Sequence, residues 1–401
     1  MSRVLLAWEL GENYGHLSTL LPLARMLRQR KHEPIFVVRD LAVASVLLGK
    51  EFSFLQAPLP SESNRQSRVP VSYADILSGR GFGKRDVLAG ILHAWQVLFD
   101  LVKPEMVVAQ FAPTAIVAAR QASIPSLQMD TGFECPPEVR PYPCFRPWMK
   151  ITREALLERE DALLQTINVV CGWRSEDLRT ALRADLSLLI TLQELDHYSG
   201  RRGGRYIGPI FSHNTGEKFA WQHTTGKRVF VYLRPFPELR ALLAELRQSR
   251  AEVIAVIPGI DRELADSFSS EQFRIISQQV RLETLLSQAD LVVSHGGHGL
   301  TSACLLQGVP LLVFPIMIEQ WMTARNLERM KTGLRVSREA LRKHGCASAL
   351  SDLLTDPLYS ERAAAVAAKY RSYDQNKTID RLALTVEQMT AGIQNHQARA
   401  H

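Results

Sequence analysis

The chain is constrained most by residues 290–320, which read DLVVSHGGHGLTSACLLQGVPLLVFPIMIEQ. Residues 291–293 are short, apolar and β-branched, which is typical of a parallel strand covered on both faces. After a glycine-rich turn, residues 300–307 favour a helix that ends at Gly308. Residues 311–315 then predict a second buried strand. This alternation indicates an α/β fold with a parallel sheet.

The turn between the first strand and the helix predicts an anion site. Gly296, Gly297 and Gly299 permit a tight turn and let a bulky anion approach the backbone, because glycine has no Cβ. The unpaired N–H groups at the start of the helix favour phosphate at the same place. His295 and His298 lie at this turn and could donate hydrogen bonds to a diphosphate, although His298 fits a helix-capping role slightly better.

Two polar residues after the second strand suit a sugar. Glu319 and Gln320 follow the strand at its carboxyl end, where the sheets of α/β proteins bind ligands. A carboxylate accepts hydrogen bonds and a carboxamide both donates and accepts them, which matches a ring of hydroxyl groups. The sequence therefore predicts phosphate recognition beside polyol recognition.

Residues 294–320 resemble the nucleotide-sugar signature of bacterial family 1 glycosyltransferases, the UDP-glycosyltransferase-like enzymes with the two-domain GT-B fold. The resemblance implies that His295 contacts the donor pyrophosphate. It implies that Glu319 and Gln320 hold the hydroxyl groups of the donor sugar. The phosphate cradle would be completed by the glycine turn and the helix start, which are Gly296, Gly297, Gly299 and Thr301.

The signature departs from the family at three positions. Ala303 stands where the family has a glutamate that binds the donor ribose, and Leu300 stands where it has a hydroxyl residue. Gln279 lies near the position of the tryptophan on which the base stacks in the family. UDP is the expected nucleotide by resemblance, while the residues that would select its base are replaced.

Composition indicates how many domains the chain can form and in which compartment it is expected. The 401 residues are 46% hydrophobic, which is enough for two sizeable cores. A formal charge of +7 is modest for this length. This charge permits binding of an anionic substrate or a membrane surface without requiring either. No nucleic-acid partner is expected. Five cysteines without metal spacing favour a reducing compartment, and no apolar run reaches membrane-spanning length, so a soluble, cytoplasmic protein is expected.

Strands and helices alternate along both halves of the chain, which predicts two doubly wound, Rossmann-like domains facing across a cleft. The first domain is expected over residues 1–205 and would bind the acceptor. A polar, glycine-containing linker is expected over residues 206–225, and the nucleotide-sugar domain over residues 226–375. The resembled fold implies that the last helix, within residues 376–401, packs back on the first domain.

His16 is the candidate catalytic base. It follows Gly15 in the loop after the first predicted strand, residues 4–8, and the family places its general base at such a pair. A neutral imidazole accepts a proton near physiological pH. The alternative is a loop histidine that caps the following helix.

An orienting carboxylate supports the base in the family, but its position here is occupied by Gln110. An amide cannot stabilise an imidazolium by charge. Glu9, Glu12 or Asp130 are the alternatives for that role, and the sequence does not choose among them.

Arg234 lies at the carboxyl end of the first strand of the second domain, within YLRPFP. A guanidinium there could bind a diphosphate through two hydrogen bonds and offset the charge on the leaving nucleotide. The alternative is a solvated arginine.

Two long segments, residues 58–83 and 130–148, are expected to be irregular and are interpreted either as acceptor-site lining or as plain surface loops.

The sequence thus favours an inverting, metal-independent hexosyltransferase. A nucleotide sugar would be its co-substrate, and no other cofactor is expected. The acceptor would be a hydroxyl group of a small molecule or a lipid, as in natural-product glycosylation. One alternative is a nucleotide-sugar epimerase or hydrolase of the same fold. The other is a catalytically weakened relative that binds a ligand or partner protein, which Gln110, Ala303 and Leu300 motivate. Neither the acceptor nor the oligomeric state follows from the sequence.

Overall fold

The structure is a computed structural model, which describes residues 1–12, 14–61, 69–198, 200–212, 216–223, 225–278 and 280–397, with side chains described through residue 391. It forms two compact units. The first contains Met1–Thr191, Tyr198–Phe211 and the chain from Asp374 onward, and the second contains Leu192–His197 and Ser212–Tyr373.

This division differs in detail from the ranges expected from the sequence. The short segment Leu192–His197 belongs to the second unit, where the side-chain amide of Asn326 donates to the carbonyl of Asp196 at 2.8 Å. Part of the expected linker, residues 213–215 and 224, lies outside the described residues, as do residues 398–401 of the expected last helix.

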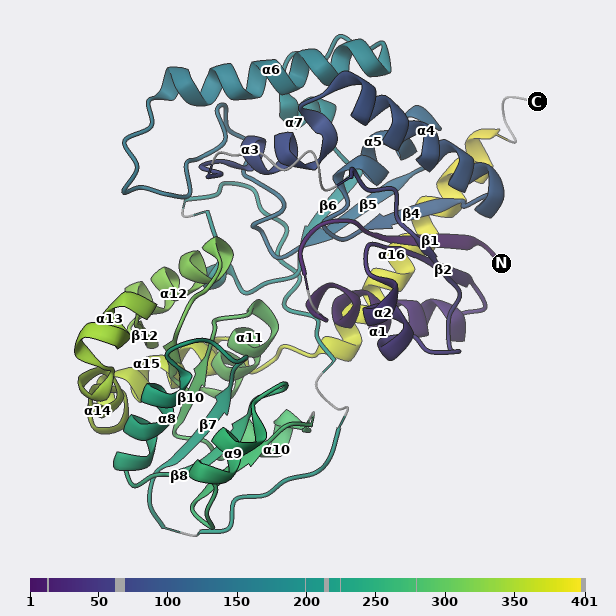
Figure 1. Cartoon of the computed structure of the whole chain (residues 1–401). Coiled ribbons are helices and arrows are strands. Elements are labelled where there is room, and N and C mark those ends of the chain that lie inside the picture. The colour runs from purple at the N-terminus through teal and green to yellow at the C-terminus, as the bar shows by residue number, and fades with distance from the viewer. Residues whose placement is uncertain are drawn as a thin grey trace. The chain divides into compact units, whose positions relative to one another are not determined.

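The first unit is built on a six-stranded parallel sheet with the order β3-β2-β1-β4-β5-β6 (Figure 1). Its central strand β1 is paired with β2 on one side and β4 on the other, and Trp8 is level with Val38 while Ala7 is level with Ala109. The residues that follow these strands therefore meet at one edge. The strands are β1 (Arg3–Trp8), β2 (Glu33–Val38), β3 (Phe54–Gln56), β4 (Met106–Ala109), β5 (Ser126–Asp130) and β6 (Leu186–Leu189).

Helices cover both faces of this sheet, and each face has its own apolar core. On one face lie α3 (Tyr73–Leu77), the π-helical turn η2 (Ser78–Phe82), α4 (Arg85–Val102), α5 (Pro113–Gln121), α6 (Arg153–Cys171) and α7 (Leu178–Ala181). On the other face lie α1 (Gly15–Gln29), α2 (Leu41–Leu47) and α16 (Gln375–Gln397). Two-sided burial explains why the strands are apolar throughout rather than alternating.

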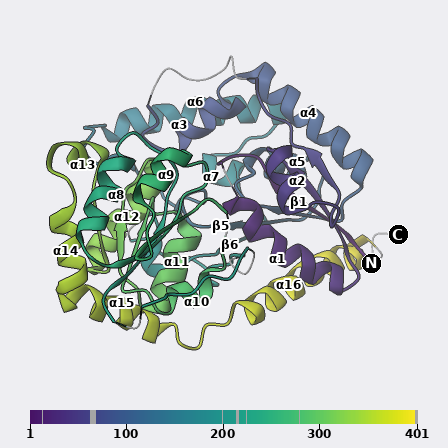
Figure 2. The same cartoon turned by 60° about the horizontal axis from the view of Figure 1, so that its bottom comes forward.

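The last helix is joined to the first by packing and charge. α16 lies beside α1 (Figure 2) and buries apolar residues such as Leu382 and Val386 in the same core. Arg30, just after α1, pairs with Asp380 at 2.5 Å and with Glu387 at 3.1 Å. These contacts place the C-terminal helix with the N-terminal sheet.

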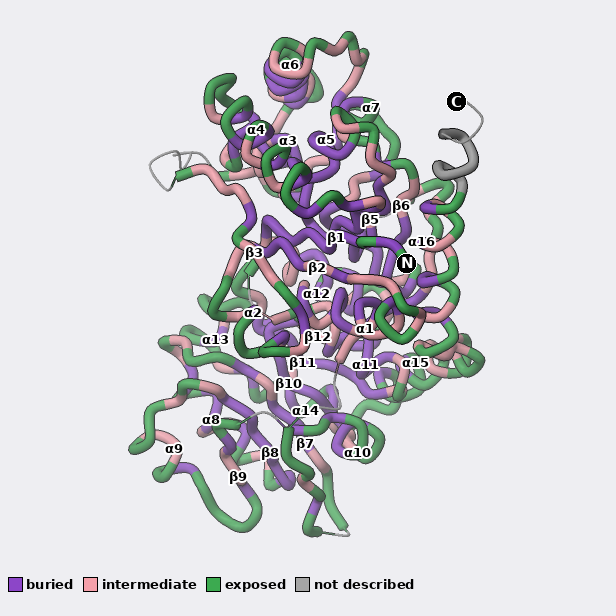
Figure 3. The backbone as a smooth tube through the Cα atoms, turned by 90° about the vertical axis from the view of Figure 1, so that its right-hand side faces the viewer, coloured by how far each residue is buried: buried purple, intermediate pink, exposed green. Residues whose placement is uncertain are grey.

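The second unit is built on another six-stranded parallel sheet, with the order β12-β11-β10-β7-β8-β9. Its strands are β7 (Arg228–Tyr232), β8 (Glu252–Val256), β9 (Phe273–Ile276), β10 (Leu291–Ser294), β11 (Leu311–Val313) and β12 (Gly333–Arg335). Its helices are the 3₁₀ turn η3 (Gln193–Leu195), α8 (Leu239–Gln248), α9 (Arg262–Phe268), α10 (Leu282–Leu286), α11 (His298–Gln307), α12 (Ile318–Met330), α13 (Arg338–His344), α14 (Ala347–Thr355) and α15 (Pro357–Lys369). In each unit the strands are largely buried, whereas the outward faces of the helices are exposed (Figure 3).

The predicted α/β class with two doubly wound, Rossmann-like sheets is confirmed. The strands β3, β6 and β12, which lie at the edges of the two sheets, are not among those predicted from the sequence. Among the described residues, no helix combines the length and the apolar character needed to cross a membrane.

Of the two long segments expected to be irregular, only the first contains helices. The first contains α3 and η2, and the carboxylate of Asp75 accepts from the backbone N–H groups of Val71 and Ser72 at the start of α3. Residues 62–68 of that segment lie outside the described residues. The second segment has no helix or strand after β5, as expected, and it buries Phe133, Tyr142 and Phe145, with the rings of Phe133 and Phe145 5.7 Å apart, while Trp148 is exposed. Apolar burial therefore packs an irregular stretch against the first unit.

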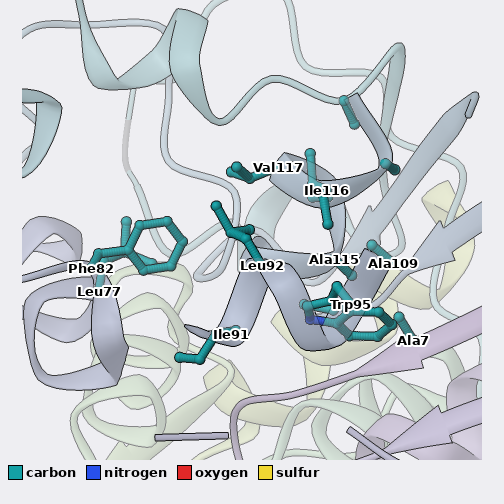
Figure 4. Packing of buried hydrophobic residues seen from close by; sticks show 14 of the residues in the cluster. Ala7, Leu77, Phe82, Ile91, Leu92, Trp95, Ala109, Ala115, Ile116 and Val117 are labelled. Carbon is teal, nitrogen blue, oxygen red and sulfur yellow. The ribbon is translucent and has the colours of Figure 1, made fainter. Parts of the chain in front are cut away.

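Trp95 on α4 is the largest side chain in the core between α4, α5 and the first sheet (Figure 4). It is fully buried, and its indole N–H donates to the hydroxyl of Thr114 at 2.9 Å. We expect Trp95→Ala to lower the free energy of unfolding by about 3–5 kcal/mol, because it leaves a cavity and removes the hydrogen bond that the indole donates to Thr114. Urea denaturation measures this change. Val97→Ala is the control on the exposed side of the same helix, and an equally large effect there would contradict the assignment of the core.

Candidate functional site

The first group of candidate residues lies at the carboxyl edge of the first sheet. His16 is in the first turn of α1, and its Nδ1 is 2.5 Å from the side-chain oxygen of Gln110. Gln110 follows β4 directly, is buried, and is held by a hydrogen bond from its backbone N–H to the carbonyl of Ala7 on β1. The pairing of β1 with β4 thus brings together two residues that are 94 positions apart in sequence.

This contact defines the tautomer of the imidazole. Because the amide oxygen of Gln110 accepts, Nδ1 of His16 carries the proton and Nε2 keeps a lone pair. The ring of Trp8 stacks on the imidazole with centroids 5.5 Å apart and 22° between the planes, and Phe111 lies on it at 6.0 Å. Gly11 has a φ of +81°, and a Cβ on it would lie 2.0 Å from Nε2, so only glycine fits beside the ring.

The surroundings keep His16 neutral. Burial lowers its pKa to about 4, the hydrogen bond to Gln110 opposes this shift, and the positive charge of Arg39 adds to it. A histidine with this pKa is unprotonated near pH 7, which is the state in which it can accept a proton.

Of the three carboxylates considered as partners of His16, Glu9 and Asp130 are hydrogen-bonded elsewhere and Glu12 is exposed. Glu9 accepts from the backbone N–H and hydroxyl of Thr114 at 3.0 and 2.7 Å, and so caps α5. Asp130 is fully buried and accepts from the backbone N–H of Phe111 at 2.8 Å. Burial raises the pKa of Glu9 to about 7 and raises that of Asp130 well above its usual range. The amide of Gln110 therefore takes the place that a carboxylate has in the resembled family.

The second group of candidate residues lies in the second unit, where β10 leads into α11. Gly296 has a φ of +82°, and a Cβ on it would lie 2.7 Å from Cγ1 of Val313, so this turn requires glycine. Gly297 is the residue before α11, and it has no side chain that could cap the helix. The first N–H groups of a helix have no acceptor inside it, so this geometry is compatible with an anion at the start of α11, and the anion site stays a prediction.

His295 forms hydrogen bonds to backbone groups in the loops after β11 and β7. Its Nδ1 donates to the carbonyl of Phe314 at 2.8 Å, and its Nε2 accepts the backbone N–H of Arg234 at 3.1 Å. Phe236 contacts the ring edge to face at 5.6 Å. Burial lowers the pKa of His295, which keeps this neutral tautomer. The alignment of Ser294 with Tyr232 and Val313 on the neighbouring strands produces these contacts.

This arrangement refines what the sequence suggested for the pyrophosphate residues. Both ring nitrogens of His295 are already hydrogen-bonded within the unit, so the ring fixes the Arg234 loop. The side chain of Arg234 is exposed, and its charge helps to lower the pKa of His295. Thr301 is fully buried, and its hydroxyl has no hydrogen-bond partner among the described residues. Gln279 lies outside the described residues.

Glu319 and Gln320 lie in the first turn of α12. The side-chain oxygen of Gln320 accepts the backbone N–H groups of Ile316 and Met317 at 2.9 and 3.2 Å, which orients its amide. The carboxylate of Glu319 is about one quarter exposed and lies 4.0 Å from Nε2 of His197. The two side chains have separate partners in the structure, and their role in binding a sugar stays a prediction.

His197 is not among the site residues predicted from the sequence. This buried histidine is 126 positions from Thr323 in sequence, and its Nε2 lies 3.2 Å from the hydroxyl of Thr323. Burial together with His197 lowers the pKa of His298 to about 3, so His298 is neutral. Among the described residues, no group of three or more histidines, cysteines or carboxylates is placed to hold a metal ion.

Comparisons with known proteins agree with this architecture. The family model "Erythromycin biosynthesis protein CIII-like, C-terminal domain" matches residues 240–380. A PGL/p-HBAD biosynthesis glycosyltransferase of Mycobacterium tuberculosis is 23% identical over 344 residues, which are 80% of this chain and 79% of that protein. NDP-glycosyltransferase YjiC of Bacillus licheniformis is 35% identical over 124 residues, which are 30% of this chain and 31% of that protein.

Solved structures show the same fold over nearly the whole chain. Spinosyn rhamnosyltransferase SpnG superimposes with a TM-score of 0.73 at 18% identity and covers 96% of this chain and 100% of its own. The Streptomyces glycosyltransferase SsfS6 superimposes with a TM-score of 0.62 at 18% identity and covers 95% of this chain and 99% of its own. These matches support a GT-B glycosyltransferase.

The two groups of candidate residues lie in different units. The first unit contains a neutral imidazole whose tautomer is set by Gln110. The second unit contains a helix that starts at a glycine, and the residues Glu319 and Gln320 in the first turn of α12. The roles of both groups stay predictions from the sequence.

The contact between His16 and Gln110 makes a prediction about charge. Gln110→Asp places a negative charge beside Nδ1, which stabilises the imidazolium, so we expect the pKa of His16 to rise from about 4. An NMR titration of the imidazole signals measures this, with the signal of His16 identified by its loss in His16→Ala. Gln110→Asn, which keeps the amide neutral, is the control. An unchanged titration in Gln110→Asp would show that the two side chains are not in contact.

Proposed function

We propose that this chain transfers a hexose from a nucleoside diphosphate sugar to a hydroxyl group of a small-molecule or lipid acceptor. The observation that carries the proposal is the uncapped start of α11, which follows the glycine turn at the carboxyl end of β10. Backbone N–H groups and the helix dipole favour a diphosphate at this position. Family and fold comparisons support the same type of activity.

The donor is held in this proposal by residues around α11 and α12. The diphosphate lies at the turn of Gly296, Gly297 and Gly299, and the exposed guanidinium of Arg234 contributes positive charge. His295 supports the turn through its hydrogen bonds to Phe314 and to the backbone of Arg234. Glu319 and the amide group of Gln320 bind the hydroxyl groups of the sugar.

The nucleotide is UDP by the resemblance of the signature, and thymidine diphosphate is its main competitor. Solved structures of this fold include SpnG complexed with thymidine diphosphate and VinC in complex with dTDP. Ala303 and Leu300 are largely buried in this chain and offer no polar group for a ribose or base. Discrimination between the two nucleotides therefore needs a direct measurement.

The reaction is proposed as a single displacement. The acceptor hydroxyl loses its proton to Nε2 of His16 and attacks the anomeric carbon, while the bond from that carbon to the diphosphate oxygen breaks. Attack opposite the leaving group inverts the anomeric configuration. Charge on the departing nucleotide is offset by the start of α11 and by Arg234, without a metal ion.

Donor binding tests the second unit. We expect calorimetric titration to show binding of UDP or thymidine diphosphate and weaker binding of GDP. His295→Ala is expected to weaken this binding at least about tenfold, because it releases the backbone of Arg234 and removes a buried hydrogen-bonded group. His344→Ala, an exposed histidine of the same unit, is the control. Absence of binding to all three nucleotides would favour the alternative of a non-catalytic binding protein.

Turnover tests the first unit. His16→Ala is expected to lower kcat by about 10²-fold or more without weakening nucleotide binding, because it removes the general base. His93→Ala is the control, since it changes an exposed histidine of the same unit. Unchanged turnover in His16→Ala would reject His16 as the base. Consumption of the sugar nucleotide without an acceptor would instead indicate the epimerase or hydrolase.

A further inference from the structure

One face of α12 is polar and packs against the segment Leu192–His197. Glu319, Thr323 and Asn326 recur at helical spacing, so they lie along the same face of this helix. Thr323 and Asn326 are buried, and the amide of Asn326 donates to the carbonyl of Asp196 at 2.8 Å. Glu319, which is about one quarter exposed, is at the accessible end of this buried polar face.

The segment Leu192–His197 is anchored in the second unit at both ends. The chain before and after it belongs to the first unit, whereas the segment itself belongs to the second. The carboxylate of Glu194 accepts from the hydroxyl of Tyr370 at 2.6 Å and pairs with Lys369 at the end of α15. The other end of the segment is hydrogen-bonded to α12. The backbone that carries His197 is therefore fixed relative to α12.

The contacts of His197 define which ring nitrogen carries a hydrogen. The hydroxyl of Thr323 donates its one hydrogen to the carbonyl of Glu319 at 3.2 Å. Its oxygen therefore accepts from Nε2 of His197, which lies 3.2 Å away. The same nitrogen lies 4.0 Å from Oε1 of Glu319. An N–H group is thus placed beside the carboxylate that is proposed to bind the donor sugar.

Burial strengthens the attraction between this N–H group and the carboxylate. The side chain of His197 is fully buried, so water competes little for its N–H group. Glu319 is in the first turn of α12, where the helix dipole also favours a negative charge. Gln320 is oriented differently, because its side-chain oxygen accepts the backbone N–H groups of Ile316 and Met317. The acidic and the amide side chains therefore depend on separate partners.

We propose that His197 is a positioning residue for the donor sugar. Its Nε2–H group attracts the carboxylate of Glu319 and holds it in the orientation in which it accepts hydrogen bonds from the sugar hydroxyl groups. This inference rests on the proposed glycosyl transfer and adds a residue from a distant part of the sequence to the sugar site. Because His197 acts through Glu319, it contributes to binding of the sugar and not to binding of the nucleoside diphosphate.

Binding with and without the sugar tests this role. Calorimetric titration compares UDP with UDP-glucose, and thymidine diphosphate with TDP-glucose. His197→Leu removes the N–H group and keeps the site filled by an apolar side chain. We expect it to weaken binding of the sugar nucleotide at least about fivefold and binding of the nucleoside diphosphate less than about twofold. A merely structural role of His197 would weaken binding of both ligands equally, and this result would overturn the proposal.

Two further variants distinguish a lost N–H group from a disturbed fold. His197→Gln places an amide N–H group near the position of Nε2, so it is expected to keep the affinity for the sugar nucleotide within about twofold of the unmodified protein. His344→Leu changes an exposed histidine of the same unit and should leave both affinities unchanged. If His197→Gln binds the sugar nucleotide as weakly as His197→Leu does, the role of the N–H group is wrong.

A double-mutant cycle tests whether His197 acts through Glu319. Glu319→Gln removes the negative charge and is expected to weaken binding of the sugar nucleotide. Adding His197→Leu to this variant should cause no further loss, because no carboxylate is left to position. Additive losses, or an unchanged affinity in Glu319→Gln, contradict the proposal.

The nucleoside diphosphates separate failure of this inference from failure of the proposed function. If they bind to the unmodified protein while His197→Leu affects both kinds of ligand equally, the positioning role is wrong and donor binding stands. If no nucleotide binds to the unmodified protein, the proposed function itself fails.

Discussion

Parallel strand pairing is the constraint on which the candidate sites depend. In each sheet the central strand is hydrogen-bonded to a neighbour that comes from a distant part of the sequence, and parallel alignment brings their carboxyl ends to one edge. This is how Gln110 reaches His16 in the first unit and how Phe314 and the backbone of Arg234 reach His295 in the second. A shift in either register would separate these partners, whatever the sequence of the loops.

The two histidines at these edges illustrate how partners decide the role of a side chain. His295 has both ring nitrogens engaged with backbone groups, so it holds loops in place and cannot donate from Nε2 in this arrangement. His16 uses only Nδ1 in the hydrogen bond to Gln110, and Nε2 keeps its lone pair. The same residue type therefore supports the anion-binding turn in one unit and fits proton transfer in the other.

Replacing a carboxylate by the amide of Gln110 changes the balance of charge rather than the geometry. The amide holds the imidazole at hydrogen-bond distance and selects its tautomer, but it contributes no negative charge. Burial and the positive charge of Arg39 lower the pKa of His16, so the imidazole beside this amide stays neutral.

The sequence by itself determined the fold class and the turn at Gly296, because buried strand runs, helix stops and glycines with positive φ are local properties of neighbouring residues. It also indicated His16, Glu319 and Gln320, which lie where strands end. Only the tertiary structure decided that Gln110 contacts His16, that His295 binds the backbone of Arg234, and that His197 lies beside Glu319. Those pairs are joined by strand register and burial, which depend on the packing of segments far apart in sequence.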